Sequence, residues 1–236
     1  MSESLAVLCA TAAAIGVVHT ALGPDHYVPF IALARARRWS AARTAAITTA
    51  CGLAHVGSSV LLGLGGVALG TALLHLERVE ALRGDLAAWL MLGFGLAYAA
   101  WGVRRARRGG VHAHPHAHAD GTRHAHDHDH AREHLHPHDS GATTATVGWT
   151  LFLIFAFGPC EPLIPLLFYP AATSGLVQVA LVVAVFAAAT VATMLAAVFA
   201  GLAVDPRRAF PGLARWEHAV AGAVVALCGV AMTAGM

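Results

Sequence analysis

The sequence predicts an all-α, polytopic membrane protein with about six transmembrane helices, and two observations support this prediction. The chain of 236 residues is 57% hydrophobic and only 12% charged, with a mean hydropathy of +0.63. A soluble domain usually has about a quarter charged residues. In addition, about six apolar runs reach the roughly 20 residues that a helix needs to cross a bilayer. The lipid bilayer is therefore the first partner that the sequence implies.

A polar central segment separates three apolar runs from three others. In order, the runs are Ser4–Gly23 with a broken continuation to Ala34, Thr44–Leu74, Leu86–Val103, Gly148–Ala171, Gly175–Val204 and His218–Met236. The central segment is rich in His, Asp, Ala and Arg and has no apolar periodicity, which predicts a disordered or loosely ordered linker. We expect a first three-helix half at residues 1–108, a His-rich loop at residues 109–140 and a second three-helix half at residues 141–236.

The arginines predict how the spans are oriented. All fifteen basic residues are arginine, and thirteen of them follow the first, third or fifth run. Only Arg78 and Arg83 fall in an even-numbered loop. Because positive residues stay on the cytoplasmic side, we expect a multi-pass protein of the bacterial cytoplasmic membrane, with both termini outside and the His-rich loop in the cytoplasm. The net charge of +2 then reflects topology and does not indicate nucleic-acid binding.

Two Gly-Pro pairs interrupt apolar runs at corresponding positions of the two halves. Leu22–Pro29 aligns with Phe157–Pro165 if one inserted residue is allowed. The helix breaks are Gly23 and Pro24 in the first half and Gly158 and Pro159 in the second. Three runs per half is an odd number, so the second half would be inserted upside down. Inverted repeats with interrupted helices indicate a transporter site near the membrane midplane, and we therefore expect two inverted three-helix repeats with broken helices.

Ionisable side chains cluster at the first break. His19, Asp25 and His26 lie in or beside an apolar run, where such groups are costly and call for a functional explanation. On an unbroken helix the two histidines would lie about 10 Å apart along the axis, whereas ligands lie about 2 Å from a metal ion. A break at Pro24 folds Asp25 and His26 back toward His19 and permits a shared metal site. A purely structural ion pair is the alternative.

Three further residues are candidate metal ligands. His55 is the remaining mid-span histidine, and Cys160 and Glu161 directly follow the second break. A thiolate and a carboxylate would complete the coordination, or Glu161 would accept a proton coupled to transport. As alternatives, Cys160 is an apolar packing residue and His55 a helix–helix hydrogen-bond donor. Imidazole with carboxylate suits Ni²⁺, Co²⁺, Zn²⁺ or Mn²⁺, and the affinity order does not choose among them.

Eleven of the sixteen histidines lie in the central segment, mainly at every second position. They are His112, His114, His116, His118, His124, His126, His128, His130, His134, His136 and His138. In an extended chain, side chains at i and i+2 point the same way. With an unperturbed pKa of about 6.5, most of these imidazoles are neutral and able to bind metal at cytoplasmic pH. We expect an accessory loop that collects or senses metal; a solvated, pH-sensitive linker is the alternative.

The motifs at the breaks resemble those of the nickel/cobalt transporter superfamily. His19-x5-Asp25-His26 resembles the His-x4-Asp-His signature of nickel/cobalt permeases with one residue more, and its Gly-x-Asp-His ending also resembles nickel permeases associated with urease and hydrogenase. The histidine tract and the segment Phe157–Pro162 resemble features of the efflux members. The resemblance implies a six-span fold with inverted repeats and a metal-binding role for His19, Asp25 and His26.

These observations favour a secondary transporter over an enzyme. Its substrate would be a divalent metal ion, Ni²⁺ or Co²⁺ with Zn²⁺ as a further option, and no permanently bound cofactor is expected. The predicted cytoplasmic loop favours efflux, while uptake stays open. A thiol–disulfide electron carrier of the wider superfamily needs a reactive cysteine pair, but the first break has Asp25 where the second has Cys160. An intramembrane metal enzyme and a metal sensor are further alternatives, and nothing in the sequence specifies an oligomeric state.

Overall fold

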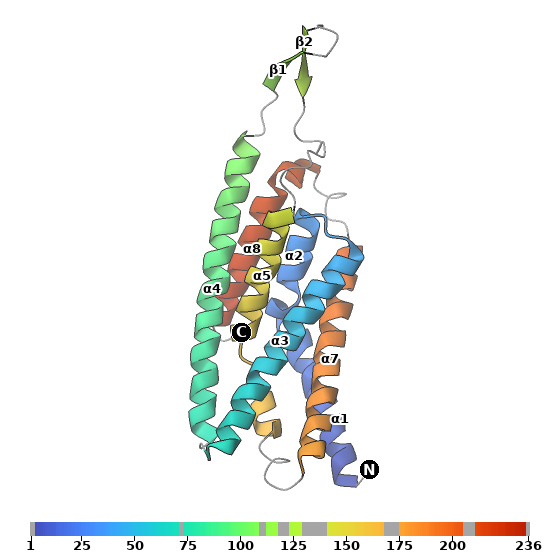
Figure 1. Ribbon diagram of the computed structural model, residues 1–236, viewed down its shortest axis with the longest axis vertical. Coiled ribbons are helices and arrows are strands. Elements are labelled where there is room, and N and C mark those ends of the chain that lie inside the picture. Colours follow the sequence, from blue (N-terminus) through green and yellow to red (C-terminus); the bar gives the residue numbers. More distant parts are fainter. Residues whose placement is uncertain are drawn as a thin grey trace.

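The protein is a bundle of helices that lie along one long axis (Figure 1). The computed structural model describes residues 3–70, 73–108, 112–117, 123–128, 141–167, 175–204 and 211–234. Among these residues, five helices are long and apolar enough to cross a membrane. The predicted all-α class is confirmed for the bundle, and its apolar helices indicate a membrane protein.

The order of the elements follows the breaks expected from the sequence. The helices are α1 Glu3–Leu22, η1 Pro24–His26, α2 Val28–Ala36, α3 Ala41–Ala68, α4 Leu73–Arg108, α5 Gly141–Phe157, α7 Leu176–Ala203, η3 Pro211–Trp216 and α8 Glu217–Thr233. The short helix η1 interrupts the path from α1 to α2 midway along the long axis (Figure 1). The chain runs toward the β1–β2 end through α1 and α2 and away from it through α5 (Figure 1).

Two short strands lie in the histidine tract, where the sequence predicts a disordered or loosely ordered linker. β1 His112–Ala117 pairs with β2 Arg123–His128 in an antiparallel hairpin. The register places a histidine of β1 opposite a histidine of β2 three times: His112 with His128, His114 with His126, and His116 with His124. The other histidines of the tract, His118, His130, His134, His136 and His138, lie outside the described residues.

Two helices differ from the predicted runs. The run Leu86–Val103 is part of the much longer α4, which begins at Leu73, so Arg78 and Arg83 lie on a helix and not in a loop. The residues before the run are mostly Leu, Glu, Ala and Arg, which are good helix formers in spite of their charge. α5 has 17 residues and ends at Phe157, because Pro159 cannot continue the helical hydrogen bonds.

Glycines allow α4 and α8 to pack with their backbones in contact. Each helix has two glycines seven residues apart, Gly95 and Gly102 on α4 and Gly222 and Gly229 on α8. A Cβ on Gly222 would meet the backbone of Ala99, and a Cβ on Gly102 would meet that of Ala219. Helices in lipid gain no hydrophobic driving force for association. The close van der Waals contact that small residues permit stabilises their packing instead.

The buried apolar side chains form two clusters, and the helix breaks lie between them. The first cluster contains Phe30, Cys51 and Phe155, and the second contains Val56 and Cys160. α3 therefore passes from the first cluster to the second between Cys51 and Val56, and the α5 segment does so between Phe155 and Cys160. Polar groups at the breaks lie at this boundary.

The glycine contacts predict opposite effects for two neighbouring substitutions on α4. A Cβ on Gly95 would lie 2.6 Å from Cα of Ala226, whereas a Cβ on Gly93 would meet nothing within 4 Å. Gly95→Ala should destabilise the protein by about 1–3 kcal/mol through overpacking. Gly93→Ala should be neutral or stabilising by up to about 1 kcal/mol, since alanine is the better helix former. Thermal unfolding in detergent measures both; equal midpoints would contradict the packing described.

Candidate metal centre

Three histidines from three elements meet at the first break. His19 comes from the last turn of α1, His26 from η1 and His55 from the middle of α3. Each ring offers a nitrogen, and the three nitrogens lie within 4.8 Å of one another. The ring centroids of His19 and His26 are 4.7 Å apart, and those of His26 and His55 are 5.1 Å apart. The break thus brings together two rings that a continuous helix would separate by about 10 Å.

The first break holds His26 by its Nδ1 atom. Gly23 has an extended backbone, and its carbonyl lies 3.1 Å from Nδ1 of His26. The carboxylate of Asp25 lies 3.3 Å from the same Nδ1. A Cβ at position 23 would lie 2.9 Å from Oδ1 of Asp25 and would collide with the ring of His26. Glycine is therefore required here for the ring to fold back onto the break.

The second break lies against the ring of His55. Pro159 has no N–H to donate to the carbonyl of Phe155, which accepts instead from the N–H of Gly158 at 3.1 Å. The aromatic ring of Phe155 lies 6.2 Å from that of His55, measured between centroids. A Cβ on Gly158 would lie 3.2 Å from Nδ1 of His55, so this glycine lets the break lie directly against the ring.

These contacts leave the same ring atom of each histidine available. Nε2 of His19, His26 and His55 is buried and has no hydrogen-bond partner. Because a carbonyl only accepts, the Nδ1 atom of His26 donates to Gly23. A neutral imidazole that donates from one nitrogen presents a lone pair on the other. Metal-binding histidines are usually held by such a contact on the far nitrogen.

The separation of the nitrogens fits a metal ion after a modest contraction. Bonds of about 2.1 Å at tetrahedral angles place nitrogen ligands about 3.4 Å apart. The three ring nitrogens lie within 4.8 Å of one another, which is somewhat wider than this spacing. Small side-chain rotations would therefore bring the three rings onto one ion. Three imidazoles would leave at least one position open for water or another ligand.

The other candidate ligands lie outside this group of three. Asp25, 21% exposed, faces Nδ1 of His26 and so lies on the other side of the ring from Nε2. Cys160 is buried in the second apolar cluster with Leu163, and Glu161 is exposed. Asp25 is thus placed to orient His26, while the structure does not bring Cys160 or Glu161 into the cluster.

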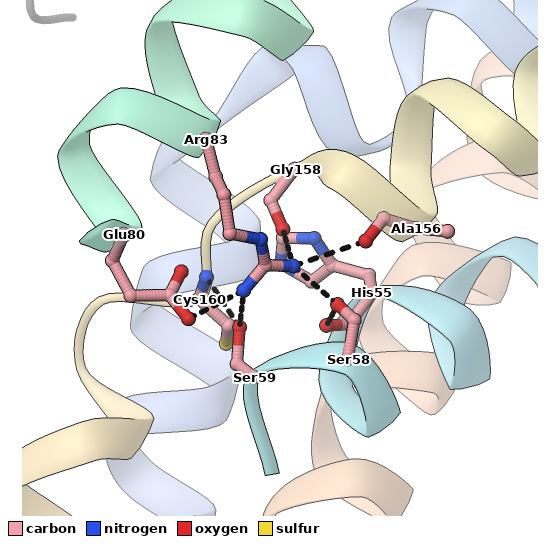
Figure 2. A network of polar contacts seen from close by, with 8 residues as sticks. All are labelled: His55, Ser58, Ser59, Glu80, Arg83, Ala156, Gly158 and Cys160. Atoms are coloured by element: carbon pink, nitrogen blue, oxygen red, sulfur yellow. Dashed lines mark hydrogen bonds and ion pairs between the residues drawn. The ribbon is translucent and has the colours of Figure 1, made fainter. Parts of the chain in front are cut away.

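A buried charged network lies beside the cluster, and the sequence reading missed it. Arg83 forms an ion pair with Glu80 and hydrogen-bonds to Ser58 and to the end of α5 (Figure 2). The apolar runs alone place Arg83 in an even-numbered loop. The available signal was the i, i+3 spacing of Glu80 and Arg83 in a stretch of helix formers that continues into an apolar run.

Together, fold and site define a class: an all-α protein with membrane-length apolar helices and three histidines, two buried and one partly buried, that meet at a helix break. Comparisons with family models, curated proteins and solved structures found no match. The functional conclusion therefore depends on the residues of this chain.

The role of Gly23 predicts the effect of adding one methyl group. Gly23→Ala should displace the ring of His26 and weaken the binding of Co²⁺ about 10- to 100-fold, which is the usual effect of disturbing the support of a ligand. Gly57→Ala is the matched control, because a Cβ on Gly57 would meet nothing within 4 Å. Isothermal titration of the detergent-solubilised protein measures both affinities. Equal affinities would show that the fold of the first break does not position a ligand.

Proposed function

We propose that the protein is a secondary transporter that moves a divalent transition-metal ion, Ni²⁺ or Co²⁺, across the cytoplasmic membrane, in the direction of efflux. The observation that carries the proposal is the group of three buried Nε2 atoms of His19, His26 and His55, none with a hydrogen-bond partner. Leaving a buried polar atom without a partner costs about 1–3 kcal/mol. Three such atoms converging on one point favour a common ligand that accepts their lone pairs.

The position of the cluster favours transport over a structural metal site. It lies at the break between α1 and α2, midway along the bundle (Figure 1), with apolar clusters to either side. Broken helices near the midplane are typical of transporters, whose sites lie where two repeats meet. The opposite courses of α1–α2 and α5 in Figure 1 fit inverted repeats.

The arginines support the proposed orientation more strongly when Arg83 is not counted among the charges that face the membrane surface. Arg83 is bound inside the bundle, so Arg78 is the remaining arginine near the start of α4. The others on described residues lie at or near the ends of α2, α4 and η3, at the start of α3 and on β2. Because positive residues stay cytoplasmic, the β1–β2 end faces the cytoplasm in this proposal. A histidine tract on that side would collect metal for export.

The ligand chemistry agrees with a nickel or cobalt substrate. Imidazole suits Ni²⁺, Co²⁺ and Zn²⁺, whereas thiolates favour softer ions. With Cys160 buried in an apolar cluster, the proposed site uses imidazoles alone and holds its ion less tightly than a thiolate site would. The same site would serve an uptake permease, so the direction of flux is part of the test.

The proposal predicts which substitutions abolish transport. His26→Ala and His55→Ala should remove saturable Ni²⁺ and Co²⁺ flux in proteoliposomes, because each deletes one of three ligands. Asp25→Asn should retain flux with an apparent affinity lowered about 10- to 100-fold, since it weakens the contact that orients His26. His75→Ala, an exposed histidine of α4, is the control and should behave as wild type.

Two results would contradict the transporter proposal. Wild-type protein that moves no divalent metal would refute transport itself. Saturable flux unchanged in both His26→Ala and His55→Ala would refute the site. Measuring flux in vesicles of known protein orientation, with metal loaded on one side, distinguishes efflux from uptake.

The histidine tract is proposed to deliver or sense metal, and the central site to carry it. Deleting residues 111–139 should therefore change the apparent affinity or the regulation of flux and preserve basal flux at saturating metal. A variant with serine in place of each histidine of the tract keeps the length of the linker between the two halves and is the matched control. Complete loss of flux in a well-folded deletion variant would instead identify the tract as the transport site.

A further inference from the structure

We propose that Arg83 is a positioning residue of the metal centre: its guanidinium holds the broken end of α5 against His55. This inference depends on the proposed metal site. It concerns a residue whose hydrogen bonds go to other partners than the three imidazoles and that belongs to α4, a helix outside the histidine group.

Arg83 and Glu80 form a charged pair within the bundle. Nη1 of Arg83 lies 2.6 Å from Oε1 of Glu80, and the two side chains are 16% and 0% exposed. By helical rise, Arg83 lies about 15 Å along α4 from its first residue. Apolar side chains of similar size often replace a buried ion pair without loss of stability. The pair therefore calls for a reason other than stability.

The other hydrogen bonds of the Arg83 guanidinium supply that reason. Nη2 of Arg83 donates to Oγ of Ser58 at 2.6 Å and to the carbonyl of Ala156 at 3.0 Å, with the carbonyl of Gly158 at 3.4 Å (Figure 2). One side chain of α4 thus bonds to α3 and to the end of α5 at once. The planar fork of arginine allows this, and a lysine ammonium has no equivalent geometry.

The bonds at the end of α5 replace the helical bond that the break removes. In a continuous helix the N–H of Cys160 would donate to the carbonyl of Ala156. Here the N–H of Cys160 donates instead to Oγ of Ser59 at 3.1 Å, and Arg83 donates to Ala156. The donor and the acceptor of the missing helical bond are thus each satisfied by a neighbouring helix, and both are held in place. Arginine is also the residue type favoured at a helix C-terminus.

The same network reaches the metal centre through α3. Ser58 and Ser59 follow His55 within about one helical turn, and Oγ of Ser58 donates to the carbonyl of His55 at 3.0 Å. On the α5 side, Gly158 lies directly against the ring of His55, since a Cβ there would be 3.2 Å from Nδ1 of His55. Arg83 therefore fixes both the turn that carries His55 and the end of α5 that lies against its ring.

Two variants test this role with Co²⁺ as the probe. Arg83→Lys keeps the positive charge beside Glu80 but loses the fork that joins α3 to α5. The double variant Glu80→Gln/Arg83→Met removes both charges, so that no unpaired charge is left to unfold the bundle. Both should weaken Co²⁺ binding about 10- to 100-fold and alter the visible absorption of bound Co²⁺, which reports ligand geometry. Arg78→Lys, exposed on the same helix, is the matched control.

A double-mutant cycle separates positioning from general damage. If Arg83 acts through His55, Arg83→Lys should have little further effect on Co²⁺ affinity in the His55→Ala background, because the positioned ligand is gone. An equal loss in both backgrounds, or wild-type affinity and spectrum in both Arg83 variants, would overturn the proposal and leave the metal site intact. Wild-type protein that binds no Co²⁺ would overturn both this inference and the proposed function.

Discussion

Inside an apolar bundle every backbone carbonyl needs a donor, and this constraint determines how the centre of the protein is built. A proline within an apolar helix removes a donor and leaves a carbonyl to be satisfied from elsewhere. At the first break the carbonyl of Gly23 accepts from the backbone N–H of His26 and lies 3.1 Å from Nδ1 of the same residue. At the second break the carbonyl of Phe155 accepts from the N–H of Gly158, and that of Ala156 accepts from Arg83. The first break thus holds His26 by Nδ1, and Nε2 of His26 and of His55 is buried without a hydrogen-bond partner. The two breaks position the imidazoles of the candidate site.

The outline of this arrangement was predictable from the sequence because its signals are local. Apolar runs, Gly-Pro pairs and polar residues beside them are read without knowing how helices pack. The folding back of His26 toward His19 follows from Pro24 and from the geometry of an unbroken helix. The ring separation of 4.7 Å agrees with that expectation. The metal-binding role of these residues remains a prediction.

The remaining contacts depend on packing between distant segments, which local patterns do not encode. His55 is 29 residues from His26 along the chain, and their meeting depends on how α3 crosses the first break. Cys160 and Glu161 stand beside the second break in sequence, but the chain directs one into an apolar cluster and the other outward. Arg83 falls between two apolar runs, and its partners belong to α3 and α5, far from it in sequence.

Charge balance explains why such a centre would suit a carrier. Three neutral imidazoles would leave a divalent ion with its full charge inside the bundle, which is costly in hydrocarbon. Asp25 supplies a negative charge next to His26 without ligating, whereas Glu80 is already neutralised by Arg83. The charge of the ion would be compensated in part by Asp25, and the ion would be bound without a thiolate ligand. A site that binds too strongly cannot release its cargo, so partial compensation from outside the ligand sphere favours a carrier over a storage or structural site.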